Sequence, residues 1–229
     1  MSVVCPECEE EYESIGTHWR YKPEHRIEIP SAQKSIFTGL LMGDGTLIRK
    51  NKTPYMTLVM TNKEFIEYIS SIFGCLAGDV KIKHTPEEAS EAAKRINPEA
   101  KPENYSTQFI LRFTSHPYYN SFKSWYGESG KEWPVDFDYD LLTFKTLYCC
   151  DGHYDNSGTN SELQLSATNE MDNKQKLKKI VNNFGLPQPS RMTQDNIVWD
   201  VKSSEKIFAM MGGPMPGFEY KWPEEYRQI

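Results

Sequence analysis

Two Asp-Gly pairs, Asp44–Gly45 and Asp151–Gly152, are the residues whose type and spacing most directly suggest chemistry. Each pair ends an apolar segment that carries two small residues four positions apart: Gly39 and Gly43 in FTGLLMGDG, Thr146 and Cys150 in FKTLYCCDG. Small residues at this spacing share one helix face and let a second backbone approach closely. If the two faces pack together, two carboxylates meet at the negative ends of two helix dipoles, where they repel. A divalent cation that prefers oxygen ligands, Mg²⁺, would offset this repulsion.

Both pairs belong to an internal repeat whose period spans nearly half of the chain. An asparagine follows each aspartate at the same interval, at Asn62 and Asn169, and each asparagine opens a segment of helical periodicity that closes on Phe-Gly. A lysine shortly before Trp-Pro also recurs, at Lys131 and Lys221. This period is too long for a solenoid repeat, so the pattern indicates two αββαββα units related by a pseudo-twofold axis.

Apolar periodicity predicts the elements that would hold these residues. We expect helices over 31–43, 65–76, 87–95, 117–126, 140–150, 177–184 and 205–211, and strands over 46–49, 56–61, 80–83, 109–114, 163–168, 190–193 and 197–202. The glycine after each aspartate is expected to take the left-handed conformation common at helix C-termini. Alternation predicts a buried face at Met56, Leu58, Met60, Leu163 and Leu165.

The N-terminal segment carries a different pattern of possible ligands. Cys5 and Cys8 are CxxC-spaced, and His18 and His25 follow. Two thiolates and two imidazoles form a typical tetrahedral Zn²⁺ site. The spacing departs from the usual C2H2 finger, which places roughly twelve residues between its Cys and His pairs. His25 could instead be a surface residue. We therefore expect a zinc-finger-like module over 1–29, followed by two halves over 30–135 and 136–229.

Composition narrows the class of protein. The chain has 229 residues and a formal net charge of −6, with 38% hydrophobic residues, too many for a disordered chain. It contains no apolar run as long as a membrane helix needs, and its first eleven residues carry four acids and no base, which argues against a membrane span and a signal peptide. An odd number of cysteines, five, argues against a disulfide framework. We expect a cytoplasmic protein of prokaryotic, archaeal or viral origin.

The two Asp-Gly segments resemble the signature motifs of the LAGLIDADG homing endonucleases in their single-chain, two-motif form. The resemblance extends over about residues 30–229; the second motif departs from the pattern, with Thr and Cys in place of Gly and Ala. It implies an α+β fold, a pseudo-twofold duplicated αββαββα saddle whose antiparallel strands lie along the DNA major groove. It also implies a monomeric, Mg²⁺-dependent enzyme, encoded in an intron or another mobile element, that cleaves both strands of a long specific double-stranded DNA site.

The resemblance assigns roles residue by residue. Asp44 and Asp151 would bind Mg²⁺ with help from the carbonyls of Gly43 and Cys150. Lys131 and Lys221 would lie near the scissile phosphate, and Asn62 and Asn169 would order water around the metal. Simpler readings stay open: the aspartates could only end helices, the asparagines could only cap them, and the lysines could be ordinary surface residues.

An acidic chain can still bind DNA if its cations gather on one face. We expect a DNA-binding face built from outward strand residues and an adjoining loop: Arg49, Lys50, Lys52, Thr57, Lys81, Lys83, Arg112, Gln164, Ser166, Arg191 and Lys202. Two rival functions remain. One is a non-cleaving protein of the same fold, an intron RNA maturase or a DNA-binding regulator. The other is a structural protein that binds no nucleic acid.

Overall fold

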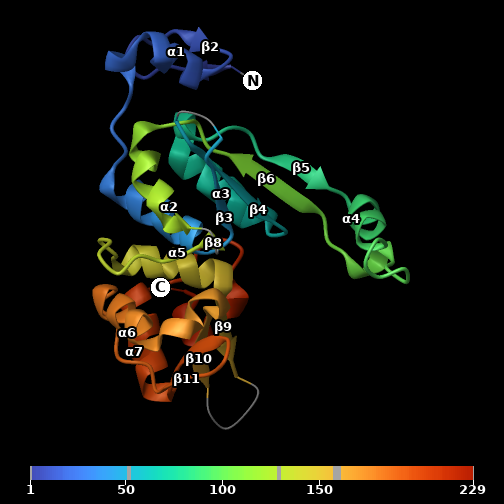
Figure 1. The fold of residues 1–229 in the computed structure, drawn as a ribbon, viewed down its shortest axis with the longest axis vertical. Helices are drawn as coiled ribbons and strands as arrows, with labels where there is room; N and C mark the ends of the chain where they lie inside the picture. The colour runs from blue at the N-terminus through green and yellow to red at the C-terminus, as the bar shows by residue number, and fades with distance from the viewer. Residues whose placement is uncertain (1, 51–52, 128–129, 157–160, 229) are drawn as a thin grey trace. The chain divides into compact units, whose positions relative to one another are not determined.

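The computed structural model describes residues 2–50, 53–127, 130–156 and 161–228 (Figure 1). Lys52 therefore lies outside the described residues. The described chain forms two compact units. Unit 1 comprises Met1–Ile29 and Gly45–Ser121, and unit 2 comprises Pro30–Asp44 and Phe122–Ile229. The division into segments 1–29, 30–135 and 136–229 stays a prediction about the duplicated sequence.

Unit 1 contains a four-stranded antiparallel sheet. Its strands are β3 (Gly45–Ile48), β4 (Tyr55–Met60), β5 (Lys81–His84) and β6 (Gln108–Arg112), in the order β3-β4-β6-β5. Met56, Leu58 and Met60 are buried and alternate with half-buried residues, as the sequence pattern predicts. Helix α3 (Lys63–Phe73) packs its apolar face against β4 and β6 and closes the core of the unit.

Helix α3 begins and ends where its residue types predict. The side chain of Asn62 accepts a hydrogen bond from the backbone N–H of Phe65 at 3.1 Å, which caps the helix N-terminus. Gly74 follows the last helical residue with a φ of 50°, a conformation that glycine adopts without a steric penalty. The later α4 (Pro86–Ala93) has a complete capping box between Thr85 and Glu88.

The N-terminal part of unit 1 consists of short elements. Strands β1 (Val3–Val4) and β2 (Glu11–Tyr12) pair, and α1 (Ile15–Tyr21) and the 3₁₀ turn η1 (Pro23–His25) follow. None of these elements was expected from periodicity, because each is shorter than the window over which apolar spacing can be recognised.

Unit 2 is built on two long helices, α2 (Ser31–Met42) and α5 (Leu141–Asp151), which pack against each other. Its antiparallel sheet has the strand order β11-β12-β10-β9. The bounds are β9 (Gly152–Asp155), β10 (Glu162–Ser166), β11 (Arg191–Met192) and β12 (Asn196–Trp199), with α6 (Lys174–Asn183) and α7 (Val201–Met211) following β10 and β12. Short strands β7 (Tyr126–Gly127) and β8 (Gly130–Lys131) form a separate hairpin. The helix expected at 117–126 is a 3₁₀ helix, η4 (Pro117–Trp125).

The two sheets repeat each other. In both, the first two strands pair, the fourth strand pairs with the second, and the third lies at the edge beside the fourth. Gly45 lies opposite Leu58, and Gly152 lies opposite Leu165. The number of residues from Gly45 to Gly152 equals the number from Leu58 to Leu165, so the two hairpins have the same register. The duplication inferred from sequence thus has a counterpart in strand order and in hairpin register.

Three expectations about local structure were wrong. Gly45 and Gly152 do not have positive φ; each starts a strand directly, and a Cβ on Gly152 would lie 2.0 Å from Cδ2 of Tyr148. Asn169 does not open α6, because it lies inside the 3₁₀ helix η5 (Thr168–Asn173) and Asn173 caps α6 instead. Lys202 does not belong to a strand, since β12 ends at Trp199 and α7 begins at Val201.

Across the described part of the chain, the helices are all too short or too polar to traverse a lipid bilayer.

Candidate active site and metal centre

The close approach of α2 and α5 depends on small residues. A Cβ atom on Gly39 would lie 2.4 Å from the carbonyl oxygen of Thr143 and 2.6 Å from Cβ of Thr146. A Cβ on Gly43 would lie 2.4 Å from Cβ of Cys150. Real Cβ atoms do not approach so closely, so glycine is required at Gly39 and Gly43. On α5, the small side chains of Thr146 and Cys150 leave enough room for this contact. The predicted helix contact through small residues is confirmed.

This packing brings the two aspartates together at the ends of their helices. Asp151 is the last residue of α5, and Asp44 follows Gly43, which ends α2. Burial and, after it, the negative charge of Asp44 raise the pKa of Asp151 to about 6, although Lys131 and Lys221 oppose the rise. Partial removal of water by the surrounding residues also raises the pKa of Asp44, against the same two lysines. Water still reaches both side chains, since Asp44 is exposed and Asp151 half-buried. The charge of Asp44 thus disfavours ionisation of Asp151, as expected of two neighbouring carboxylates.

The side chains of the two predicted lysines contact the C-terminal ends of the same helices. The Nζ atom of Lys131 donates to the carbonyl oxygen of Gly43 at 2.6 Å. The Nζ atom of Lys221 donates to the carbonyl oxygens of Cys149 at 2.6 Å and Cys150 at 3.2 Å. Each ammonium group thus neutralises the negative end of one helix dipole. Burial lowers the pKa of both lysines, and the nearby aspartates oppose this effect.

Aromatic and acidic residues hold Lys131 in place. The indole Nε1 of Trp133 donates to the carbonyl oxygen of Met42 at 3.1 Å, one residue before the carbonyl that Lys131 binds. The backbone N–H of Trp133 donates to Oε1 of the buried Glu170 at 2.7 Å, and Oε2 of Glu170 lies 2.9 Å from Nζ of Lys176. Glu170 was not identified from the sequence, where it stands out in no motif.

A matching arrangement supports Lys221. The hydroxyl of Tyr148, on α5, donates to the carbonyl oxygen of Lys221 at 2.9 Å. The indole Nε1 of Trp222 donates to the carbonyl oxygen of Gly212 at 2.9 Å. The Trp-Pro that follows each lysine in the repeat is the sequence signal that could have revealed the role of the two tryptophans, because a tryptophan that recurs in both halves indicates a shared packing position.

The donor set at the helix ends fits a hard divalent cation. It consists of the carboxylates of Asp44 and Asp151 and the carbonyls of Gly43 and Cys150, all oxygen atoms, which Mg²⁺ prefers. The carbonyls already attract positive charge, since the ammonium groups of Lys131 and Lys221 lie 2.6 Å and 3.2 Å from them. A carbonyl oxygen has two lone pairs, so it can accept a lysine N–H and contact a cation together.

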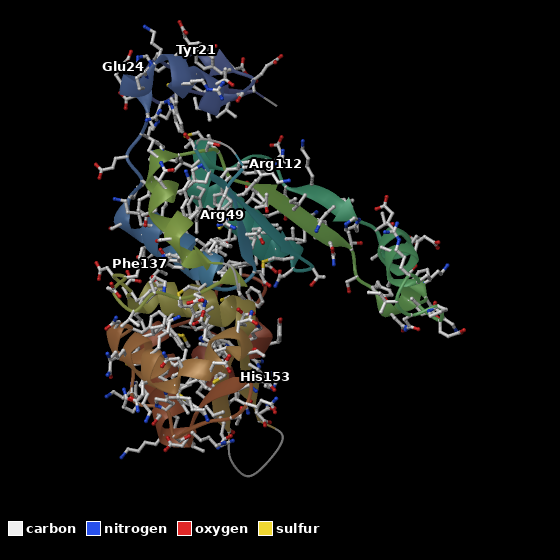
Figure 2. The ribbon with its side chains drawn as sticks, viewed as in Figure 1. Tyr21, Glu24, Arg49, Arg112, Phe137 and His153 are labelled. Atoms are coloured by element: carbon white, nitrogen blue, oxygen red, sulfur yellow. The ribbon has the colours of Figure 1, made fainter. Side chains whose placement is uncertain are left out.

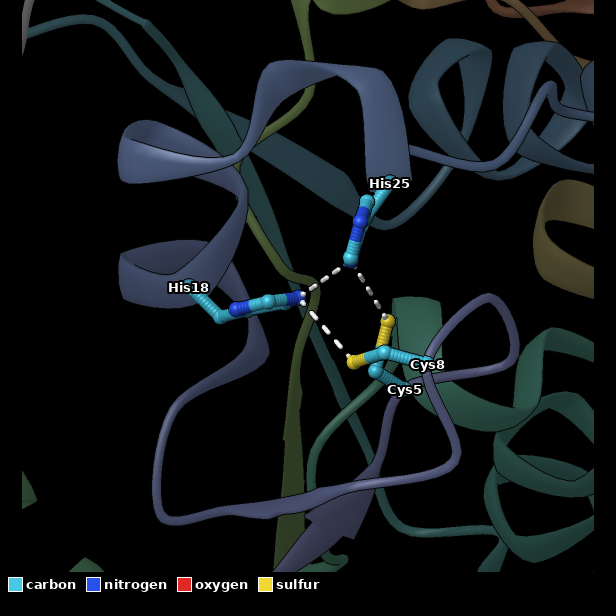
Figure 3. A group of neighbouring side chains, drawn as sticks. All are labelled: Cys5, Cys8, His18 and His25. Atoms are coloured by element: carbon cyan, nitrogen blue, oxygen red, sulfur yellow. Dashed lines mark hydrogen bonds between the residues drawn. The ribbon is translucent and has the colours of Figure 1, made fainter.

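The four predicted zinc ligands converge in unit 1 (Figure 3). Their ligand atoms all lie within 4.8 Å of one another, with 3.1 Å between His18 Nε2 and His25 Nδ1, 3.7 Å between Cys8 Sγ and His18 Nε2, and 4.0 Å between Cys5 Sγ and His25 Nδ1. A tetrahedral zinc site has ligand–ligand edges of about 3.3–3.8 Å. The cluster can therefore hold a metal ion, and His25 is one of its members.

Groups next to the cluster favour the binding of a cation. Burial tends to raise the pKa of the Cys5 thiol, but hydrogen bonds from the backbone of Cys8 and Glu7 help to lower it overall. The ring of Tyr12 stacks on that of His18 with centroids 3.9 Å apart. A thiolate-favouring environment and a fixed imidazole are what a metal ligand set requires.

Comparison with known proteins identifies the architecture. No protein-family model and no curated protein matches the chain. Among solved structures, the homing endonuclease I-WcaI bound to its DNA recognition sequence is similar over 92% of this chain and 91% of its own, with a TM-score of 0.67 and 15% identity. The chain has the homing endonuclease fold. I-SmaMI bound to an uncleaved DNA target is similar over 80% of this chain and 85% of its own, with a TM-score of 0.48 and 9% identity.

In this homing endonuclease fold, the outward face of the first sheet is basic. Strand pairing places Thr57 beside Arg112, and Lys81 beside Ile110 on the same face. Arg112, Lys81 and Lys83 are exposed, as are Arg49 and Lys50 after β3; Arg49 and Arg112 are labelled in Figure 2. The guanidinium of Arg112 lies 5.5 Å from the centre of the Tyr55 ring.

The outward face of the second sheet presents less positive charge. Gln164 is half-buried and Ser166 exposed on β10, as predicted. Arg191 is exposed, but its two terminal nitrogens lie 2.7 Å and 2.6 Å from the carboxylate oxygens of Glu162. Lys202 is exposed on α7 rather than on the sheet.

The two predicted asparagines differ in their settings. Asn62 caps α3 in unit 1, which is the simpler of the two roles considered for it. Asn169 is exposed in η5, next to Glu170. The matched role inferred from their equal spacing to the aspartates therefore stays a prediction.

Proposed function

We propose that this protein is a divalent-metal-dependent endonuclease that cleaves both strands of a specific double-stranded DNA site. The observation that carries the proposal is the pair of aspartates, Asp44 and Asp151, at the ends of two tightly packed helices. Each helix end also binds a lysine. The charge of Asp44 helps to raise the pKa of Asp151, so ionising both carboxylates costs stability unless a cation joins them, which is the pattern expected of a functional site.

The chain's own groups can each take a part in phosphodiester hydrolysis. Asp44 and Asp151 would hold Mg²⁺, with the carbonyls of Gly43 and Cys150 beside them. When bound, Mg²⁺ would polarise the phosphate and lower the pKa of the attacking water. Lys131 and Lys221 would offset the negative charge that develops on the phosphate oxygens, because burial has removed water that would otherwise screen them.

We further propose that the cluster of Cys5, Cys8, His18 and His25 binds Zn²⁺ and fixes the fold of the N-terminal segment. Four ligands from nitrogen and sulfur leave no open coordination position, so the role is structural rather than catalytic. A segment of short elements has little apolar core of its own, and a metal supplies the missing stability.

The decisive experiment is selection of cleaved sequences from a randomised duplex library in the presence of Mg²⁺, followed by assay of variants on the selected site. The double variant Asp44→Asn, Asp151→Asn should lose cleavage while it retains DNA binding, and the exposed control Asp138→Asn should behave as the original protein. Full cleavage by the double variant would refute the mechanism.

Binding assays on the same purified protein, with intron RNA and with duplex DNA, separate the rival functions. Binding of intron RNA with no cleavage of any duplex would indicate a maturase. Binding of one DNA sequence without cleavage would indicate a regulator. No affinity for nucleic acid at low salt would exclude all three, because phosphate contacts always give affinity there.

A further inference from the structure

A large groove in unit 1 lies between the N-terminal segment and the sheet. It has a volume of about 1160 Å³. Glu13, Ser14, Thr17 and Arg20 line one side of it, from β2–α1 and α1. The other side is lined by residues of the sheet and of the turns beside it, among them Tyr55, Lys81, Ile110, Arg112 and Thr114.

The net charge of the residues that line this groove favours the binding of an anion. Three cations line it, Arg20, Lys81 and Arg112, and all three are exposed. Two acids, Glu13 and Asp79, also line it and leave a net positive charge. Several hydroxyl groups lie among the cations, and hydroxyls and guanidinium groups are the usual partners of DNA phosphates.

The groove continues the outward face of the first sheet. Arg112 lies opposite Thr57 on that face, and Lys81 lies opposite Ile110. Three of these residues, Thr57, Lys81 and Arg112, already belong to the face that we expect to bind DNA. Arg20 adds a cation from a different part of the chain to the same surface.

Packing holds the N-terminal segment against the end of the sheet. Nε2 of the buried His116 lies 3.2 Å from the carbonyl oxygen of Ile27, and the ring of His116 meets that of Trp19 edge-on at 6.4 Å. A Cβ on Gly16 would lie 3.2 Å from Cγ2 of Thr114. Trp19 directly follows His18, a member of the metal cluster. The position of Arg20, the residue after Trp19, is therefore tied to both the metal cluster and the sheet.

We propose that the metal-binding segment extends the DNA-binding surface, with Arg20 contacting a backbone phosphate next to those bound by Lys81 and Arg112. The inference rests on the proposed function, since it assumes that the first sheet binds duplex DNA. The contact is to the phosphodiester backbone and adds affinity without reading sequence.

The test measures the affinity of the full-length, zinc-loaded protein for a random-sequence 40-base-pair duplex over a series of KCl concentrations. Arg20→Ala should weaken binding about three- to tenfold at low salt and reduce the log–log salt slope by about 1, because one phosphate contact is lost. Lys22→Ala is the matched control. It removes one positive charge from the same segment, where Lys22 lies 3.9 Å from Glu24 and outside the groove, and it should leave affinity and slope unchanged.

The other outcomes distinguish failure of the Arg20 contact from failure of the proposed nuclease function. Equal affinities and slopes for Arg20→Ala and Lys22→Ala would refute the inference and leave the proposed nuclease intact. Failure of the unaltered protein to bind the duplex would refute the proposed function itself. If Arg20→Ala weakened binding to an RNA hairpin but not to the duplex, the groove would be an RNA site and the inference would be wrong.

Discussion

The ammonium nitrogen of Lys131 lies 2.6 Å from the carbonyl oxygen of Gly43, the C-cap residue of α2. Lys221 makes similar contacts with the end of α5, where it donates to the carbonyl oxygens of Cys149 at 2.6 Å and Cys150 at 3.2 Å. Two cations thus lie where two helix dipoles and two aspartates place negative charge. The lysines offset part of this charge, so the folded unit tolerates a pair of repelling carboxylates when no metal is bound.

The lysine contacts predict a separable effect on catalysis. Lys131→Met and Lys221→Met should each lower the cleavage rate about a hundredfold or more, because charge stabilisation of the transition state is lost. Each should also lower the free energy of unfolding by about 1 kcal/mol through loss of the helix-end contact. The measurements are single-turnover cleavage and urea unfolding.

Lys145→Met provides the control for these variants. Nζ of Lys145 donates to the carbonyl oxygen of Met211, the last residue of α7, at 3.0 Å. Its loss should cost similar stability and leave the cleavage rate unchanged. If it slowed cleavage as much as Lys131→Met does, a general loss of folded protein would explain both results.

The pKa of Asp151, raised to about 6, predicts that stability depends on pH. An unfolded aspartate has a pKa of about 3.9, so the folded state holds the proton more tightly. The contribution of Asp151 to the free energy of unfolding of the metal-free protein should therefore fall as pH rises from about 4 to above 6. The raised pKa of Asp44 acts in the same direction.

Asp151→Asn should flatten this dependence and stabilise the metal-free protein at pH 8 by about 1 kcal/mol, a value reduced because water screens the half-buried side chain. Added Mg²⁺ should stabilise the original protein at pH 8 more than the variant. Urea unfolding at several pH values, with EDTA or Mg²⁺, measures both effects. An Asp151→Asn variant whose stability changed with pH in the same way as that of the original protein would contradict the assigned charge repulsion.

The contact between α2 and α5 predicts a strict requirement at Gly39. Gly39→Ala should destabilise the protein by about 3 kcal/mol, because the new Cβ would lie 2.4 Å from the backbone oxygen of Thr143, which cannot move away as a side chain can. Gly127→Ala adds the same methyl group where no neighbour lies within 4 Å, and should change stability little. Equal unfolding midpoints for the two variants would show that the helices do not pack this closely.

The buried Glu170 predicts a positioning effect on Lys131. Glu170→Ala removes the acceptor of the Trp133 N–H, so the segment that carries Lys131 should loosen, and kcat should fall about tenfold with little change in KM. Glu170→Gln keeps an acceptor oxygen and should recover most of the rate despite losing the pairing with Lys176. A purely structural role would lower the fraction of active protein in both variants and leave the rate per active molecule unchanged.

The cluster in the N-terminal segment predicts one bound zinc per chain. Cys5→Ser combined with Cys8→Ser should abolish it, since Ser does not replace a thiolate as a zinc ligand. Cys75→Ser, at a half-buried cysteine outside the cluster, should retain it. Elemental analysis of the purified variants decides the point, and unchanged zinc in the double variant would refute the assignment.

Local chemistry in the sequence was sufficient to predict much of this protein. Residue types and spacing indicated the repeat, the contact of α2 and α5 through small residues, and the Cys/His cluster. They also indicated that the two helices end near Asp44 and Asp151. These features depend on neighbours a few residues away, or on a repeated pattern, and such signals are visible without a structure.

Tertiary structure alone decided the contacts that join distant parts of the chain. Lys131 binds a carbonyl 88 residues away, Glu170 binds the N–H of Trp133 37 residues away, and Glu162 pairs with Arg191 29 residues away. Asn173 rather than Asn169 caps α6 because a 3₁₀ turn intervenes. These outcomes follow from how whole elements pack. Packing is set by all the contacting side chains together, so no local pattern predicts which carboxylate or carbonyl a given side chain will meet.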